Sequence, residues 1–288
     1  MTDGLAASTA VDDWRKKEVE RFMRDAEEAI RLGDLDMART HYWGALRFDP
    51  QNIIARMRLG LALKKQGNGS AALEEFTTVT KFAPDYAEAW KEKGILEGQI
   101  ARRIPKDVRN ENMKWLADGS ASLKRATLLN PDDFDAWSSL GGIFKNVHGD
   151  LAGAKEMYAH AADISDGHPY PLLNALKLEA QHTGKLDLKR VREQLKDAEK
   201  LRLAQTLTTP PTDTPWCYFD LAELRLYQRD ENGFLEHLKA GIQSSTAGWQ
   251  VETCRNTLDN TLVARGIQLP GLSKGIKLLD DAIASSGK

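Results

Sequence analysis

The chain has 288 residues, of which 41% are hydrophobic and 28% are charged, and its formal net charge is −2. This composition is typical of a folded, water-soluble protein, and the near-balance of charge argues against wholesale binding of nucleic acid or of an anionic membrane. The sequence lacks an uninterrupted apolar run of about 18 residues, so it predicts no membrane-spanning helix.

The first residues, MTDGLAASTAVDDW, lack the basic start and the apolar core of a secretory signal. We expect residues 1–11 to be disordered and the protein to be cytoplasmic. The two cysteines, Cys217 and Cys254, are far apart in sequence and stand outside any C-x-x-C motif. They do not form a disulfide framework, so we expect a reduced environment and a packing role for both thiols.

A repeat begins near the start of the chain, where Pro50 and Pro84 stand 34 residues apart. Counting backward from each proline, small, apolar and aromatic residues follow at gaps of 5, 3, 4 and 12 residues: Ala45, Tyr42, Ala38 and Ala26 in one segment, and Val79, Phe76, Ala72 and Gly60 in the next. Small residues let two antiparallel helices approach closely, and a proline ends the second helix. The spacing therefore predicts repeated helical hairpins.

Two longer hairpins follow. The third ends at Pro131, carries Trp90 and Gly94 in its first helix, and is 13 residues longer than the first repeat, with the additional residues near 98–118. The fourth has Trp137 in the same place as Trp90 and is one residue longer.

The run of W-x-x-x-G, a small residue, an aromatic residue, alanine and proline resembles the tetratricopeptide repeat family over residues 12–167. The resemblance implies an all-α fold, namely a right-handed superhelical stack of antiparallel helix hairpins. It also implies that a protein partner, usually a peptide segment, binds in the concave groove that the first helices line. Two positions depart from the pattern, because Arg56 replaces the tryptophan of the second hairpin and Asp166 the proline of the fourth.

Beyond residue 167 the pattern decays. Apolar residues at spacings of three and four predict a degenerate hairpin over 168–203. The segment 204–215 holds three prolines and five threonines, so we expect a loop there and the best internal boundary of the chain. Residues 216–288 are expected to form a helical hairpin and capping helices that close the stack.

Mapping the family's groove onto the first four hairpins gives a set of candidate partner-binding residues: Arg24, Glu27, Met57, Arg58, Lys64, Lys65, Lys91, Glu92 and Ser139. Chaperone-binding members of the family hold a C-terminal carboxylate with Lys and Asn. The matching positions here are Met23, Glu27, Glu88 and Glu92. Acidic side chains repel an acidic tail, so a chaperone cofactor of that kind is disfavoured.

The lengthened third hairpin is the second candidate surface. Between residues 98 and 130, seven basic residues stand against three acidic ones, and the candidate contacts are Arg102, Arg103, Lys106, Arg109 and Trp115. We expect an acidic protein partner here. Nucleic-acid phosphate is the second expectation, because phosphate contacts require only Lys and Arg.

Catalytic and cofactor motifs are missing from the sequence, including the P-loop, the dinucleotide fingerprint, H-E-x-x-H and G-x-S-x-G. His160, Asp163, Asp166 and His168 lie close in sequence, but polar helix ends explain them more simply than a metal site does. We therefore expect a non-enzymatic scaffold or adaptor without a cofactor.

Two alternatives stay open: a regulatory subunit that gates an effector enzyme in signalling or bacterial defence, and a nucleic-acid-binding protein that uses the basic hairpin. The identity of the partner and self-association, for instance a dimer through residues 216–288, also stay open.

Overall fold

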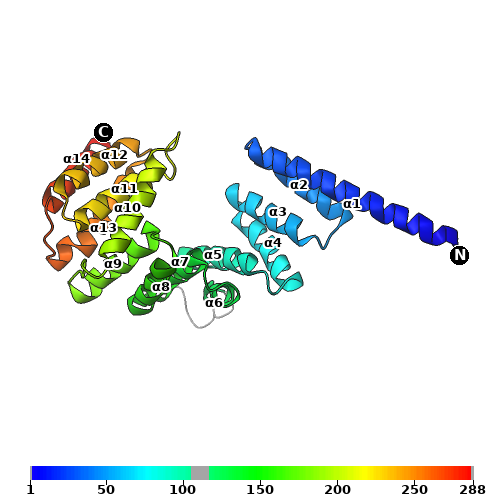
Figure 1. Ribbon diagram of the computed structural model, residues 1–288, viewed down its shortest axis with the longest axis horizontal. Coiled ribbons are helices and arrows are strands. Elements are labelled where there is room, and N and C mark those ends of the chain that lie inside the picture. The colour runs from blue at the N-terminus through cyan, green and yellow to red at the C-terminus, as the bar shows by residue number, and fades with distance from the viewer. Residues whose placement is uncertain (1, 105–116, 287–288) are drawn as a thin grey trace. The chain divides into compact units, whose positions relative to one another are not determined.

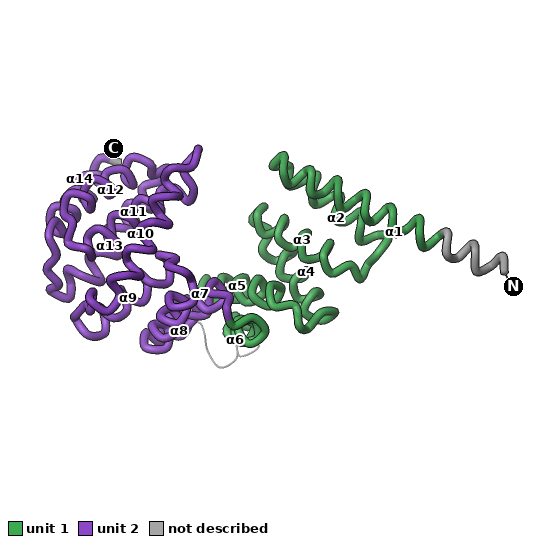
Figure 2. The backbone as a smooth tube through the Cα atoms, in the orientation of Figure 1, with its two compact units in different colours: residues 1–131 green, residues 132–288 purple. Residues whose placement is uncertain are grey.

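The computed structural model describes residues 2–104 and 117–286, with side chains for residues 11–104 and 117–285. Over these residues the chain forms helices and no strand, which confirms the prediction of an all-α fold (Figure 1). Two compact units divide the chain, residues 1–131 (unit 1) and residues 132–288 (unit 2) (Figure 2). None of the described helices is both long and apolar enough to cross a membrane.

Unit 1 is a stack of helical hairpins in which the second helices of the first two hairpins also pack on the first helix of the next hairpin. Its described helices pair in order along the chain: α1 (Thr2–Arg31) with α2 (Leu35–Phe48), α3 (Ile53–Lys65) with α4 (Gly69–Phe82), and α5 (Ala87–Arg103) with α6 (Ser120–Leu129). A single hairpin cannot cover its own apolar face, so the core continues from one hairpin to the next.

Helix α1 differs from the expectation of a disordered N-terminus. It begins at Thr2, so residues 2–11 continue the helix that packs on α2. The segment 5–10, LAASTA, contains three alanines, and alanine has the highest intrinsic helix propensity.

The turns inside the first two hairpins repeat the same local chemistry. Gly33 and Gly67 have φ angles of 79° and 80°, a region that glycine enters without a steric penalty. The next residue caps the second helix: Asp34 accepts a hydrogen bond from the backbone N–H of Met37 at 2.9 Å, and Asn68 caps α4 in the same way.

Within a hairpin the two helices touch at the small residues of the repeat. A Cβ atom added to Gly60 would lie 2.5 Å from the Phe76 ring, and one added to Gly94 would lie 2.7 Å from Leu123. Ala72, on the helix facing Gly60, is fully buried. The small residues thus allow the helix backbones to approach.

Arg56 stands where the third hairpin has Trp90, and its side chain makes the same kind of backbone contact as that tryptophan. Trp90 donates from its indole nitrogen to the carbonyl oxygen of Pro84 at 2.9 Å. Arg56 donates to the equivalent carbonyl of Pro50 from Nε at 3.0 Å and from a terminal nitrogen at 2.8 Å. Arg56 also forms an ion pair with Glu75 on α4 at 2.9 Å.

Unit 2 adds further helix pairs, which are α7 (Phe134–Ile143) with α8 (Leu151–Ile164), α9 (Pro169–Thr183) with α10 (Arg192–Thr206), α11 (Trp216–Tyr227) with α12 (Glu231–Ser244), and α13 (Gly248–Thr261) with α14 (Leu272–Ser286). The first pair contains a π-helical turn, Phe144–His148, directly after α7. A π turn accommodates one more residue than an α turn, and this hairpin is one residue longer than the first repeat.

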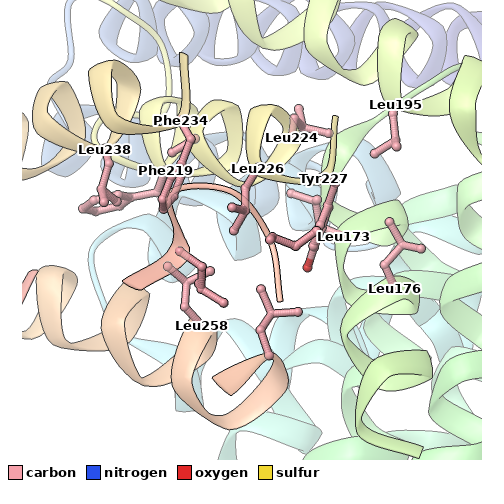
Figure 3. Packing of buried hydrophobic residues seen from close by; sticks show 14 of the residues in the cluster. Leu173, Leu176, Leu195, Phe219, Leu224, Leu226, Tyr227, Phe234, Leu238 and Leu258 are labelled. Carbon is pink, nitrogen blue, oxygen red and sulfur yellow. The ribbon is translucent and has the colours of Figure 1, made fainter. Parts of the chain in front are cut away.

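The segment 204–215 does not divide the chain, contrary to the boundary expected from its prolines. Arg202 on α10 is 4% exposed and donates from Nε to Asp220 on α11 at 3.0 Å. One apolar core runs through α9 to α14 and includes Leu195 and Leu224 from opposite sides of this segment (Figure 3). The division lies between Pro131 and Asp132 instead.

Candidate protein-binding surfaces

Four of the predicted groove residues are exposed on the first helices of unit 1. Arg24 and Glu27 lie on α1, and Arg58 and Lys65 lie on α3, all with exposed side chains. Arg58 and Lys65 are seven residues apart, which is two helical turns, so they lie on the same face of α3.

Electrostatics connect Arg58 to the neighbouring hairpins. Burial raises the pKa of Tyr42, Arg58 lowers it in part, and Glu27 raises it further. Burial and Glu88 raise the pKa of Tyr86, and Arg58 again lowers it in part. Arg58 on α3 therefore lies within electrostatic range of Tyr42 and Tyr86. Tyr42 is also within range of Glu27 on α1, and Tyr86 is within range of Glu88 on α5. The first helices of three successive hairpins carry an acidic, a basic and an acidic residue, which we call the unit 1 charge row.

Other predicted groove residues are not available to a partner. Met57 is 2% exposed and belongs to the apolar core of unit 1, because it is turned by about 100° from its neighbour Arg58 on the helix. Glu92 is also buried, and it forms an ion pair with Lys64 that joins α3 to α5. Lys64 and Glu92 therefore hold successive hairpins together.

Two further predicted groove residues are half-buried, as Lys64 is. Lys91 on α5 has an interaction partner within the protein, and Ser139 lies on α7 in unit 2.

The basic third hairpin is described only in part. Arg102 and Arg103 are exposed in the last turn of α5, which has 17 residues against 13 in α3. Lys106, Arg109 and Trp115 lie outside the described residues. On α6, Arg125 is exposed and donates a hydrogen bond to the carbonyl of Pro84 at 3.5 Å.

Unit 2 contains a cavity of about 430 Å³ that no motif in the sequence predicts. It lies among the first helices α9, α11 and α13 together with α10 and α12, and we call it the unit 2 cavity. Its apolar lining comes from the core shown in Figure 3: Leu173, Phe219, Phe234, Leu238 and Leu258.

A buried ion pair forms part of the polar wall of this cavity. Lys177 on α9 contacts Glu223 on α11 at 2.8 Å, with side-chain exposures of 15% and 8%. Tyr227 donates its hydroxyl to the other oxygen of Glu223 at 2.6 Å. Burial lowers the pKa of Lys177, but Glu223 and Asp220 outweigh it, so the pKa is raised and the ammonium stays charged.

A second ion-pair group continues the wall. Arg202 donates to Asp220 and, at 2.8 Å, to Asp213 in the connection between α10 and α11. Burial raises the pKa of Asp220, and the opposing effects of Arg202 and Lys177 do not cancel that increase. The spacing of Asp220, Glu223 and Tyr227 places all three on one face of α11, and this polar stripe in an apolar helix is the signal that could have indicated the site.

Burial controls the protonation of the two thiols. Burial raises the pKa of Cys254 to about 12, and burial also raises the pKa of Cys217, so both thiols are protonated at neutral pH. His160 packs edge-on against Trp137 at 4.5 Å. Over the described residues, no three His, Cys, Asp or Glu side chains are grouped as a metal site would require.

Comparisons with known proteins bear on the fold. No protein-family model and no curated protein matches the sequence. The solved structure of PilF from Pseudomonas aeruginosa aligns over 84% of this chain and 98% of its own, with a TM-score of 0.59 and 13% identity. A segment of MamA from Desulfovibrio magneticus RS-1 aligns over 65% and 97%, with a TM-score of 0.51 and 18% identity. Another MamA structure aligns over 66% and 95%, with a TM-score of 0.50 and 21% identity. At these identities the likeness shows a shared fold.

Proposed function

This chain has the tetratricopeptide-repeat fold, and from that premise we propose that it is a non-enzymatic scaffold that binds a protein partner on the first helices of unit 1. The observation that carries the proposal is the unit 1 charge row of Glu27, Arg58 and Glu88 on three successive hairpins. A fold hosts many functions, so the function of this chain depends on what this surface binds.

The charge row is complementary to a partner whose charges have the opposite sign at each position. Exposed charges contribute little to the stability of a protein, but complementary charges orient an approaching partner and exclude wrong ones. The core residues beneath the row, among them Met57, fix the hairpins in position. The row is therefore a pre-formed surface, and its alternation favours an extended segment that presents basic, acidic and basic groups in turn.

Further expectations from the sequence belong to the same proposal. The exposed end of α5, with Arg102 and Arg103, provides a second contact for an acidic region of the same partner. The protein acts in the cytoplasm and without a cofactor. Regulation of a partner enzyme is a finer version of the same proposal, in which binding to unit 1 changes the partner's activity.

The test is a quantitative pull-down of the tagged protein from its native cell extract, with mass spectrometry of the proteins that are recovered. Arg58→Glu combined with Lys65→Glu reverses two exposed charges on a first helix. The control is Arg47→Glu combined with Lys81→Glu, which makes the same charge change at exposed positions of the second helices α2 and α4. We expect a stoichiometric partner that is lost with the first variant and kept with the control.

Retention of the partner by the Arg58 and Lys65 variant would place the binding surface elsewhere. Loss in both variants would indicate an effect of net charge alone. Recovery of nucleic acid instead of a protein, with loss on charge reversal of Arg102 and Arg103, would favour nucleic-acid binding through the third hairpin.

A further inference from the structure

The unit 2 cavity has the size of a small-molecule site. Its volume of about 430 Å³ lies within the range of about 300–1,000 Å³ that is common for such sites. Its apolar side is formed by buried core residues that already hold their positions, so a ligand would enter a pre-formed space. In Figure 3, Phe219, Phe234 and Leu238 lie together and Leu258 approaches from α13.

The charged side of the cavity has an excess of one carboxylate. Its charged residues form an alternating chain that begins and ends on an acid: Glu223, Lys177, Asp220, Arg202 and Asp213. Both cations are neutralised by carboxylates of the protein, so an anionic ligand would have to displace existing ion pairs.

The excess negative charge lies at the Asp213 end of this chain. Lys145 does not line the cavity, and its electrostatic neighbours are Lys177 and Glu223 at the opposite end. Burial lowers the pKa of His168, which lies within electrostatic range of Asp213, so this imidazole is largely neutral at pH 7. A ligand near Asp213 therefore meets a carboxylate that shares a single arginine with Asp220.

Aromatic rings also line the cavity. Trp216 lines it and packs against Trp249, with the ring centres 5.9 Å apart, and Trp249 is 58% exposed. Tyr170 also lines the cavity and is 47% exposed, and the side chain of Asp213 is 45% exposed. Indole and phenol rings attract cations, because the face of each ring carries negative potential.

We propose that the unit 2 cavity binds a small amphipathic cation, with an apolar body against Phe219, Phe234 and Leu258 and an ammonium or guanidinium group near Asp213 and Trp216. This site is separate from the unit 1 charge row and does not depend on the proposed function. The apolar body provides affinity through burial, and the cationic group selects orientation.

Three probes that share a phenyl ring separate charge from burial: 2-phenylethylamine, 2-phenylethanol and 3-phenylpropionate. Binding to the full-length chain is measured by titration calorimetry and by ligand-observed NMR. We expect the amine to bind most tightly, the alcohol less tightly and the carboxylate least. Equal or tighter binding of 3-phenylpropionate would overturn the proposal, and so would failure of the amine to bind at millimolar concentration.

Variants then locate the binding. Thr253 is exposed on α13 and lines the cavity, so Thr253→Trp narrows the entrance without altering the core, and we expect it to weaken amine binding by about tenfold or more. The matched control is Glu252→Trp at the adjacent exposed position, which does not line the cavity and should leave binding unchanged. Unchanged binding in the Thr253 variant, or equal loss in both, would overturn the assignment of the site.

The charge preference is tested by Asp213→Asn. Asp213 has a φ of 60°, which asparagine tolerates well, and Arg202 keeps its contacts to Asp220 and Gln205. We expect amine binding to weaken by about three- to tenfold, with binding of the alcohol unchanged. Equal weakening of both probes would show that Asp213 does not select the cation.

Discussion

Arg56 and Trp90 donate hydrogen bonds to equivalent proline carbonyl groups in successive hairpins. Each donates to the proline carbonyl six residues before it, so a planar cationic group replaces an indole without loss of the hydrogen bond. Arginine adds an ion pair to Glu75 that the indole could not make. Arginine at this position therefore changes the chemistry of the side chain and retains the hydrogen bond to the backbone.

This contact has a measurable effect on stability. Arg56→Ala should lower the free energy of unfolding in a urea titration by about 1–2 kcal/mol, because the Pro50 carbonyl and Glu75 lose their partner. Arg56→Trp should lose less, since the indole restores the hydrogen bond to Pro50. Arg58→Ala removes an exposed neighbour and should change the value by less than about 0.5 kcal/mol. Equal effects of the two alanine variants would contradict the structural role of Arg56.

The sequence predicts the positions where helices meet better than the residues that a partner would touch. Gly60 and Gly94 belong to the repeat because contact with the facing helix requires a small residue. Mapping the family's groove onto this sequence by position alone does not distinguish Arg58 from its neighbour Met57. On a helix these neighbours point in directions about 100° apart, so one is exposed and the other is in the core.

At the scale of helices, the fourth hairpin shows how the fold absorbs an additional residue. The π-helical turn Phe144–His148 takes up the residue after α7, and α8 then begins with a regular cap in which Asp150 accepts from the backbone N–H of Gly153. The sequence indicates the added residue by its spacing, but it does not indicate whether a loop or a helical turn absorbs it.

The start of α9 gives the chain a pH-dependent element. His168 accepts a hydrogen bond from the backbone N–H of Tyr170 at 3.3 Å, and burial, with a smaller effect of Arg202, lowers the pKa of the imidazole below its ordinary value of 6.5. The folded state thus binds fewer protons than the unfolded state between the lowered pKa and 6.5. Stability is complete above this window and falls as the pH decreases through it.

His168→Asn tests this linkage, because asparagine is a good helix cap that does not titrate. We expect the free energy of unfolding, measured in urea at a series of pH values from 7.5 to about 5, to fall less steeply for the variant than for the wild type. His237, whose pKa is also lowered by burial, is present in both proteins and cancels in the comparison. Parallel pH profiles would show that His168 does not titrate differently in the two states.

At the scale of the whole chain, the expected and observed boundaries differ for a physical reason. A run of prolines and threonines predicts a break in regular structure, which is local information. Whether two units separate depends on contacts across the break, and these involve residues far apart in sequence, such as Arg202 with Asp220 and Lys177 with Glu223. The same long-range pairing forms the wall of the unit 2 cavity. Local sequence patterns therefore predict neither the position of the boundary nor the cavity.

Fragments of the chain distinguish the two boundaries. Residues 132–288 contain the complete apolar core from α9 to α14, so this fragment should be helical by circular dichroism and should unfold cooperatively in urea. Residues 216–288 lack Leu173, Leu176 and Leu195 and leave the carboxylates of Asp220 and Glu223 without their cations. Because an apolar face without its cover and a buried charge without its partner both oppose folding, this shorter fragment should show a weak, non-cooperative transition. A cooperative transition in residues 216–288 comparable to that of residues 132–288 would restore the boundary at the threonine- and proline-rich segment.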